Sequence, residues 1–118
     1  MAHECTGCGG CGMTTGVASH FPVAEMVQYQ DDTIVSRTIS DSEAGSLTLF
    51  AFAEGQRLST HSAPYEAIVQ VIDGEAVITV AGTPYRVKTG DMIVMPADAP
   101  HSVDAVKPFK MILTMFTA

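Results

Sequence analysis

"LSTHSAPYEAIVQVIDGE", residues 58–75, is the stretch of sequence that decides the fold. It holds one histidine, His61, followed by a β-branched apolar run, and near its end stands an Asp-Gly pair at residues 73–74. A second apolar run, residues 75–81, follows the pair. Asp-Gly between two such runs is a strong hairpin signal, because glycine at the second turn position adopts a positive φ without steric cost. The stretch therefore predicts a β-hairpin with an imidazole close to its start.

The rest of the chain repeats this pattern of short apolar runs separated by turn-forming residues. The predicted strands are residues 23–29, 33–39, 46–52, 67–72, 75–81, 83–88, 91–96, 101–106 and 109–116. Hardly any segment has the length and period of a helix. Many short strands at this spacing predict an all-β sandwich or barrel.

Composition and charge narrow the class of protein. The 118 residues suit one domain, and 47% of them are hydrophobic, which is enough for a packed core. The six basic residues are scattered among thirteen acidic ones, leaving a net charge of −7. Nucleic acid is therefore not an expected partner, because phosphate binding needs a clustered basic surface. With no apolar run long enough to cross a bilayer and no pattern of a secretory leader, we expect a cytoplasmic protein without a membrane partner.

Residues 1–20 differ from the remainder and are interpreted as an N-terminal arm, with one barrel domain at 21–118. The arm contains all three cysteines and half of the ten glycines. Cys5, Cys8 and Cys11 have C-x2-C-x2-C spacing, and the run is similar to the cluster-binding loop of ferredoxin-like proteins. The fourth cysteine of that loop is missing, so a set for zinc or an iron–sulfur cluster would be completed by His3, by a ligand from another chain or by a ligand from the barrel. The alternative is an arm whose thiols bind no metal.

The barrel domain resembles the small single-domain cupins in two motifs. Six residues fall in register with these motifs: Gly55, His61 and Gly74 in the first, and Gly90, Pro96 and His101 in the second. The resemblance implies the cupin double-stranded β-helix, a jelly-roll β-barrel. It also implies a homodimer, because small cupins commonly pair. Asp98 stands where the second motif usually has glycine, and it is expected to form a turn because Asp tolerates left-handed backbone.

The departures from the motifs affect the expected metal site. Ala63 and Ala67 stand where the family has its second histidine and its glutamate. Of the usual metal ligands, only His61 and His101 therefore remain. Strand alternation would place residues 61, 63, 65, 67, 69 and 71 on one face, directed into the barrel. The candidate pocket therefore consists of His61, Ala63, Tyr65, Ala67 and His101. Two imidazoles bind a divalent metal weakly, since catalytic sites normally have three protein ligands, although Tyr65 could supply a phenolate.

Three functional hypotheses follow. The first is a cupin that binds a small organic ligand in the barrel, because the two alanines leave space that is apolar with a few polar groups. The second is a metal-dependent enzyme, a dioxygenase or an isomerase, with His61 and His101 holding zinc, iron, manganese, nickel or copper. The third is a redox or metal-handling protein that acts through the cysteine arm.

Overall fold

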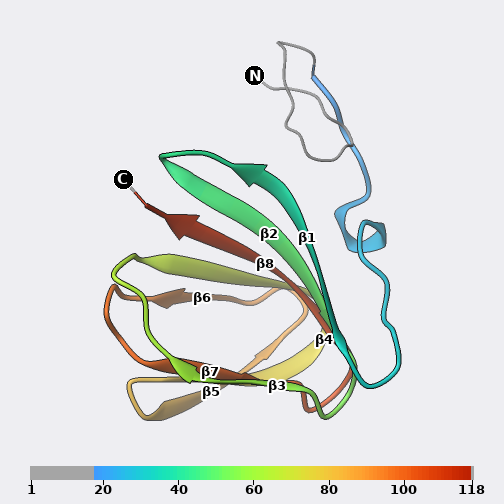
Figure 1. The fold of residues 1–118 in the computed structure, drawn as a ribbon. Coiled ribbons are helices and arrows are strands. Elements are labelled where there is room, and N and C mark those ends of the chain that lie inside the picture. The colour runs from blue at the N-terminus through green and yellow to red at the C-terminus, as the bar shows by residue number, and fades with distance from the viewer. Residues whose placement is uncertain (1–17, 118) are drawn as a thin grey trace.

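A computed structural model describes residues 18–117 of the protein (Figure 1). The described part contains one 3-10 turn, η1 (Val23–Glu25), and eight strands. The strands are β1 (Ile34–Asp41), β2 (Gly45–Phe52), β3 (Arg57–His61), β4 (Ala67–Val80), β5 (Thr83–Lys88), β6 (Met92–Met95), β7 (His101–Asp104) and β8 (Phe109–Phe116). No helix within this part is long and apolar enough to span a membrane. The predicted metal ligands of the arm, His3, Cys5, Cys8 and Cys11, lie outside the described residues.

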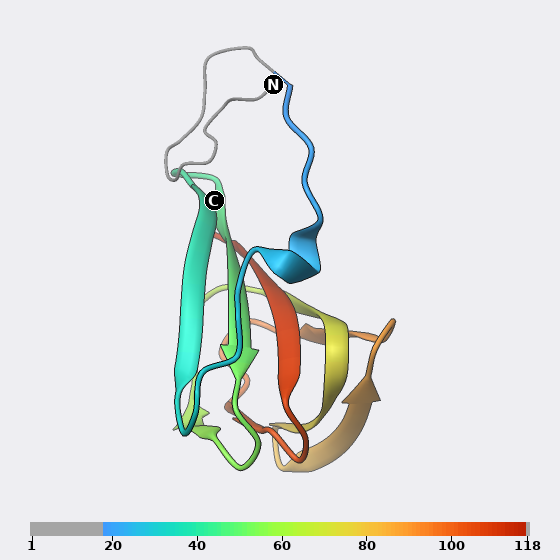
Figure 2. The ribbon, with the colours of Figure 1, turned by 90° about the vertical axis from the view of Figure 1, so that its right-hand side faces the viewer.

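The strands form two curved antiparallel sheets that share β4. Sheet A has the order β1-β2-β8-β4-β6, and sheet B has the order β5-β4-β7-β3. Figures 1 and 2 show the two sheets curling toward each other around a common interior. This arrangement confirms the predicted all-β jelly-roll barrel.

The predicted hairpin at Asp73-Gly74 is wrong, because residues 67–80 form the single 14-residue strand β4. The first half of β4 pairs with β6 and β8 in sheet A, and the second half pairs with β5 and β7 in sheet B. A bulge between Val71 and Asp73 and the φ of 80° at Gly74 bend the strand between the two sheets. The Asp-Gly pair therefore correctly predicts a positive φ at Gly74, but this residue lies at a corner of the barrel and not in a hairpin turn. The tight turn lies at Ala81-Gly82, where both φ angles are positive.

The predicted strand at residues 23–29 is also wrong. The segment forms η1 and then crosses the outer face of sheet A, where Val23, Met26 and Val27 pack against Leu49 and Ala51. These three apolar residues are spaced by three and four positions, which suits a helical turn better than the alternation of a strand. The segment thereby forms a second, smaller core outside the barrel.

The main core fills the barrel between the two sheets. Its largest fully buried side chains include Phe52 and Phe109, whose ring centroids are 4.9 Å apart, together with Val69, Ile78 and Met111. Burying one such side chain typically contributes about 1.5–3 kcal/mol relative to leaving it exposed. The interior is thus an apolar core to which the inner faces of both sheets contribute.

Contacts made by Lys110 and Tyr29 hold residues 23–29 against sheet A. The buried Lys110 on β8 donates a hydrogen bond from Nζ to the Ala24 carbonyl at 2.6 Å, and the same nitrogen lies 4.9 Å from the Tyr29 ring centroid. The Tyr29 hydroxyl donates to Oδ2 of Asp73 at 2.5 Å, at the bend of β4. Burial, and next the hydrogen bond to this carboxylate, raise the pKa of Tyr29 above its usual value. The folded protein therefore stabilises the neutral form of the Tyr29 phenol relative to the ionised form.

Candidate functional site

His61 and His101 form a cross-strand pair in sheet B. His61 is the last residue of β3, His101 is the first residue of β7, and the two are direct partners in the sheet. Their ring centroids lie 4.4 Å apart with the ring planes at 67°. His101 is only 8% exposed, whereas His61 is exposed. The pair therefore combines one buried imidazole with one that solvent can reach.

A β-bulge in β3 places the two rings on the same face. Leu58 pairs with Val103 and His61 pairs with His101, so three steps along β3 correspond to two steps along β7. Val103 belongs to the buried barrel core, and Leu58 packs against that core. Because alternate residues of β7 share a face, His101 lies on the inner face with Val103, and the bulge turns His61 onto that face as well.

Backbone carbonyls fix the tautomer of both imidazoles. Nδ1 of His61 lies 2.9 Å from the Ser59 carbonyl oxygen, and Nδ1 of His101 lies 3.1 Å from that of Ala99. A carbonyl oxygen only accepts hydrogen bonds, so each Nδ1 must carry the proton that it donates. In a neutral ring the lone pair then resides on Nε2. Both imidazoles consequently have an Nε2 that can accept a proton or a hydrogen bond, or bind a metal.

The other predicted pocket residues lie in different surroundings. Ala67 is buried in β4 and pairs with the buried Met95 of β6, and both belong to the barrel core. Residues 62–66 form a loop between β3 and β4, in which Ala63 is half-buried and Tyr65 is exposed. The strand alternation that placed Tyr65 on the inner wall does not extend across this loop. Of the predicted pocket residues, His61 and His101 are the two whose rings lie side by side.

Asp98 joins the loops of the two motifs. Its φ is 69°, which agrees with the turn expected at this position, and its backbone N–H donates to the Ala63 carbonyl at 2.7 Å. The Ala99 N–H closes the same turn by donating to the Pro96 carbonyl at 3.2 Å. The loop before β7 is therefore held against the loop after β3, and both loops adjoin the histidine pair.

The donor set for a metal is incomplete among residues 18–117. No group of three or more His, Cys, Asp or Glu side chains in this range is arranged to hold a metal ion. Two imidazoles fall short of the three protein ligands that a catalytic metal normally has. The described residues alone therefore do not fit a resident metal of the usual cupin kind.

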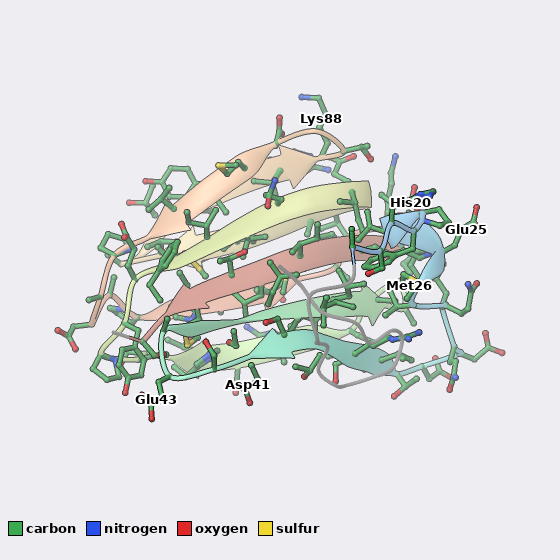
Figure 3. All side chains as sticks on the ribbon, turned by 90° about the horizontal axis from the view of Figure 1, so that it is seen from above. His20, Glu25, Met26, Asp41, Glu43 and Lys88 are labelled. Carbon is green, nitrogen blue, oxygen red and sulfur yellow. The ribbon has the colours of Figure 1, made fainter. Side chains whose placement is uncertain are left out.

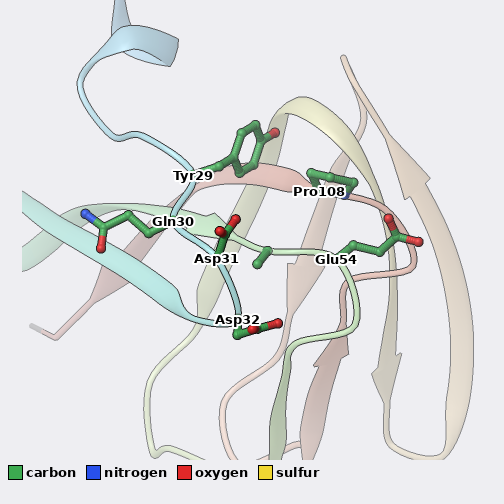
Figure 4. A pocket seen from close by; sticks show the side chains of 7 residues that line it. Tyr29, Gln30, Asp31, Asp32, Glu54 and Pro108 are labelled. Atoms are coloured by element: carbon green, nitrogen blue, oxygen red, sulfur yellow. The ribbon is translucent and has the colours of Figure 1, made fainter.

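A pocket that the sequence did not predict lies near the start of β3 rather than at its histidine end. It has a volume of about 300 Å³. Its lining comes from three separate segments, namely Tyr29, Gln30, Asp31, Asp32, Ala53, Glu54 and Pro108 (Figure 4). The carboxylates give the pocket an acidic rim. No motif could have indicated it, since the segments are brought together by the fold alone.

Two sheets that share one strand and carry an imidazole pair on the inner face define a small jelly-roll barrel protein. The family model of the Cupin domain matches residues 48–116, which is more than half of the chain. The chain therefore belongs to the cupin family.

Solved structures of two bacterial proteins are similar to it. A conserved protein of unknown function from Streptococcus pyogenes is 34% identical, with a TM-score of 0.81 and coverage of 88% of this chain and 91% of the other. A cupin 2 conserved barrel domain protein from Leptotrichia buccalis is 40% identical, with a TM-score of 0.79 over 81% of this chain and 47% of the other. The chain thus spans about half of the Leptotrichia protein. No curated protein matches the chain.

Proposed function

We propose that the protein is a small-molecule-binding cupin that holds an organic ligand at His61 and His101. The observation that supports this function is the pair of Nε2 atoms left available by the hydrogen bonds of both Nδ1 atoms. With ring centroids 4.4 Å apart, one polar group of a ligand can interact with both rings. The neutral rings would accept hydrogen bonds from a hydroxyl or N–H group, and a protonated ring would donate to a carboxylate.

The surroundings of the pair favour a ligand that is partly apolar. His101 has Val80 of β4 as its sheet partner on one side and His61 on the other, and Val103 follows it on the same face. Val80 and Val103 belong to the barrel core. Small-ligand sites are typically apolar with a few polar groups that fix orientation. An apolar molecule with one hydroxyl, N–H or carboxyl group matches this pattern.

Native mass spectrometry of the protein purified without unfolding tests the proposal. We expect a small-molecule adduct on the wild-type protein that is lost in the His61→Ala, His101→Ala double variant. The matched control is His20→Ala, because His20 is an exposed histidine outside the pair, and this variant should keep the adduct. The proposal is refuted if the wild-type protein carries no adduct, or if the double variant retains it.

Metal handling is the second candidate function, and the C-x2-C-x2-C spacing of Cys5, Cys8 and Cys11 favours it. Elemental analysis after anaerobic purification distinguishes the possible sites. Zinc or iron that disappears in a variant with all three cysteines changed to serine would assign the metal to the arm. A metal lost only in the His61→Ala, His101→Ala variant would favour a metal-dependent dioxygenase or isomerase. Wild-type protein that contains no metal would refute both a metal site on the arm and a metal site at the histidine pair.

A further inference from the structure

Basic side chains are absent from the part of the barrel that holds the histidine pair. The pair lies beside two loops, residues 62–66 after β3 and residues 96–100 before β7, and we call the pair with these loops the histidine end. No Lys or Arg occurs within residues 58–85 or 89–106, which include all of it. Figure 1 shows the β3–β4 loop on the left and the bend of β4 on the right. The histidine end and the bend of β4 therefore stand on opposite sides of the barrel.

The six basic side chains all have polar partners elsewhere. Four of them form salt bridges, in the pairs Arg57–Asp104, Arg86–Glu75, Lys88–Asp91 and Lys107–Glu75. Glu75 directly follows the bend of β4, so two of these bridges lie at that bend. The remaining two side chains donate hydrogen bonds to backbone carbonyls, Arg37 to that of Met26 and Lys110 to that of Ala24. None of the six is therefore placed to bind an anionic group at the histidine pair.

The histidine end carries carboxylates instead. Glu66 and Asp98 are exposed residues of its two loops. Backbone hydrogen bonds hold both of them in place, because the Asp98 N–H donates to the Ala63 carbonyl at 2.7 Å and the Glu66 carbonyl accepts from the Phe116 N–H at 3.1 Å. Two carboxylates therefore stand in the loops that adjoin the histidine pair.

The turn between β1 and β2 adds negative charge near these loops. The hydroxyl of Thr117 donates to the Glu43 carbonyl at 2.9 Å, and Thr117 follows Phe116, whose N–H binds the Glu66 carbonyl. Figure 3 shows Asp41 and Glu43 together at this turn, on the opposite side of the molecule from Lys88. The electrostatic field at the histidine end is therefore negative, because it has carboxylates and no Lys or Arg.

The histidine pair presents hydrogen-bond acceptors to a ligand. Each Nδ1 donates to a backbone carbonyl, so the Nε2 of a neutral ring accepts. Within residues 18–117, neither Nε2 has a hydrogen-bond partner. This matters most for His101, because the residue is only 8% exposed and a buried acceptor without a donor is unfavourable. A ligand that donates to both nitrogens would satisfy them at once.

We infer that the ligand of the histidine pair is an organic ammonium ion with an apolar body, an inference that rests on the proposed function. An ammonium group has three N–H donors and no acceptor, so one head group can donate to both Nε2 atoms. Its charge is attracted by the carboxylates of Glu66 and Asp98. An alcohol has one donor for two acceptors, and a carboxylate meets only acceptors and like charges. The ammonium ion is thus the head group that matches both the hydrogen bonds and the charge.

NMR titration of the full chain tests this preference with three probes that share one apolar body. The probes are phenethylammonium, phenethyl alcohol and hydrocinnamate, and a butyl series of ammonium, alcohol and carboxylate covers a smaller site. EDTA removes bound metal beforehand, and the imidazole nitrogen signals of His61 and His101 report binding. At about pH 7.5 the amine is protonated and the carboxylic acid is ionised. We expect the ammonium probe to bind at least about tenfold more tightly than the carboxylate, with the alcohol between them.

Replacing the two carboxylates of the loops tests the contribution of charge. In a Glu66→Gln, Asp98→Asn double variant, the ammonium probe should bind at least about threefold more weakly, whereas binding of the alcohol should stay unchanged. Asparagine suits position 98, because it tolerates the φ of 69° found there. Glu54→Gln is the matched control, because Glu54 is an exposed carboxylate just before β3, at the other end of that strand from His61, and should leave both affinities unchanged.

The outcomes separate the ammonium ligand from the proposed function. An alcohol or carboxylate that binds the pair as tightly as the ammonium, or ammonium binding that is unchanged in the double variant, overturns the ammonium inference alone, because the pair still holds a ligand. If no probe shifts the imidazole signals, the inference is also wrong, and the adduct measured by native mass spectrometry decides separately whether the pair binds another ligand. Circular dichroism checks that the double variant is folded, and Glu66→Gln alone replaces it if it is not.

Discussion

Gly74→Ala should strongly destabilise the protein, because this glycine meets two separate constraints at the bend of β4. Its φ is +80°, in the left-handed region that disfavours residues with a Cβ. A Cβ at this position would also overlap the Pro108 carbonyl oxygen and come within 2.8 Å of the Phe109 Cα. Both of these are backbone atoms at the start of β8, so no side-chain rotation can relieve the contact.

The size of the effect follows from adding the two terms. Left-handed backbone costs an alanine about 1–2 kcal/mol relative to glycine. Relieving overlap in a packed region typically costs a further ~1–3 kcal/mol, here by displacing the start of β8 from β4. Gly74→Ala should therefore lower the free energy of unfolding by about 2–5 kcal/mol. Gly82→Ala is the matched control, because Gly82 has a φ of +86° but no atom within 4 Å of an added Cβ.

Urea unfolding followed by circular dichroism measures both variants. The change in unfolded-chain entropy between glycine and alanine is common to the two substitutions and cancels in the comparison. We expect Gly74→Ala to be less stable than Gly82→Ala by about 1–3 kcal/mol. Equal destabilisation by the two substitutions would show that the contact with Pro108 adds nothing, and the account of the β4 bend would then be wrong.

Three further substitutions test the contacts around the barrel. The raised pKa of Tyr29 means that the folded protein favours the neutral phenol, so the free energy of unfolding should fall as pH rises above about 10, and less steeply in Tyr29→Phe. Urea unfolding at successive pH values checks this, and identical slopes would exclude a contribution from the hydrogen bond to Asp73. Phe109→Ala should cost about 3–5 kcal/mol, because Phe109 is fully buried, and a smaller loss in urea unfolding would contradict this packing. Arg57→Ala should cost at most about 1 kcal/mol, because its salt bridge with Asp104 is exposed on both sides, and a larger loss in thermal unfolding would point to another role for Arg57.

The sequence predicted most strands but misjudged how they connect at Gly74. Alternating and β-branched runs identified the strand residues on both sides of the glycine, because these patterns depend on local burial. The Asp-Gly signal reports a preference for positive φ, which the structure confirms. Whether the chain reverses there or bends depends on Pro108, which lies far along the sequence and contacts Gly74 only in the folded barrel. A local pattern cannot distinguish these two outcomes.

The segment at residues 23–29 shows a different limit. It is short and rich in apolar residues, so its composition suits a strand or a helical turn. The structure resolves the choice through the outer face of sheet A, where Val23, Met26 and Val27 meet Leu49 and Ala51. The apolar surface of that face could not be assigned before the register of β2 and β8 was known. The contact with it decides the local conformation of the segment.

The histidine pair depends on a feature that motif spacing does not encode. The two cupin motifs predicted His61 and His101, but they did not predict the bulge in β3. Because of this bulge, the segment from Leu58 to His61 has one residue more than the segment of β7 with which it pairs. Without that extra residue, His61 would face away from Val103 and the barrel core, because neighbouring side chains of a strand point to opposite faces. The hydrogen bonds of both Nδ1 atoms to backbone carbonyls likewise depend on the local backbone path. The residue types were therefore predictable, whereas the availability of both Nε2 atoms for one ligand is a property of the folded backbone.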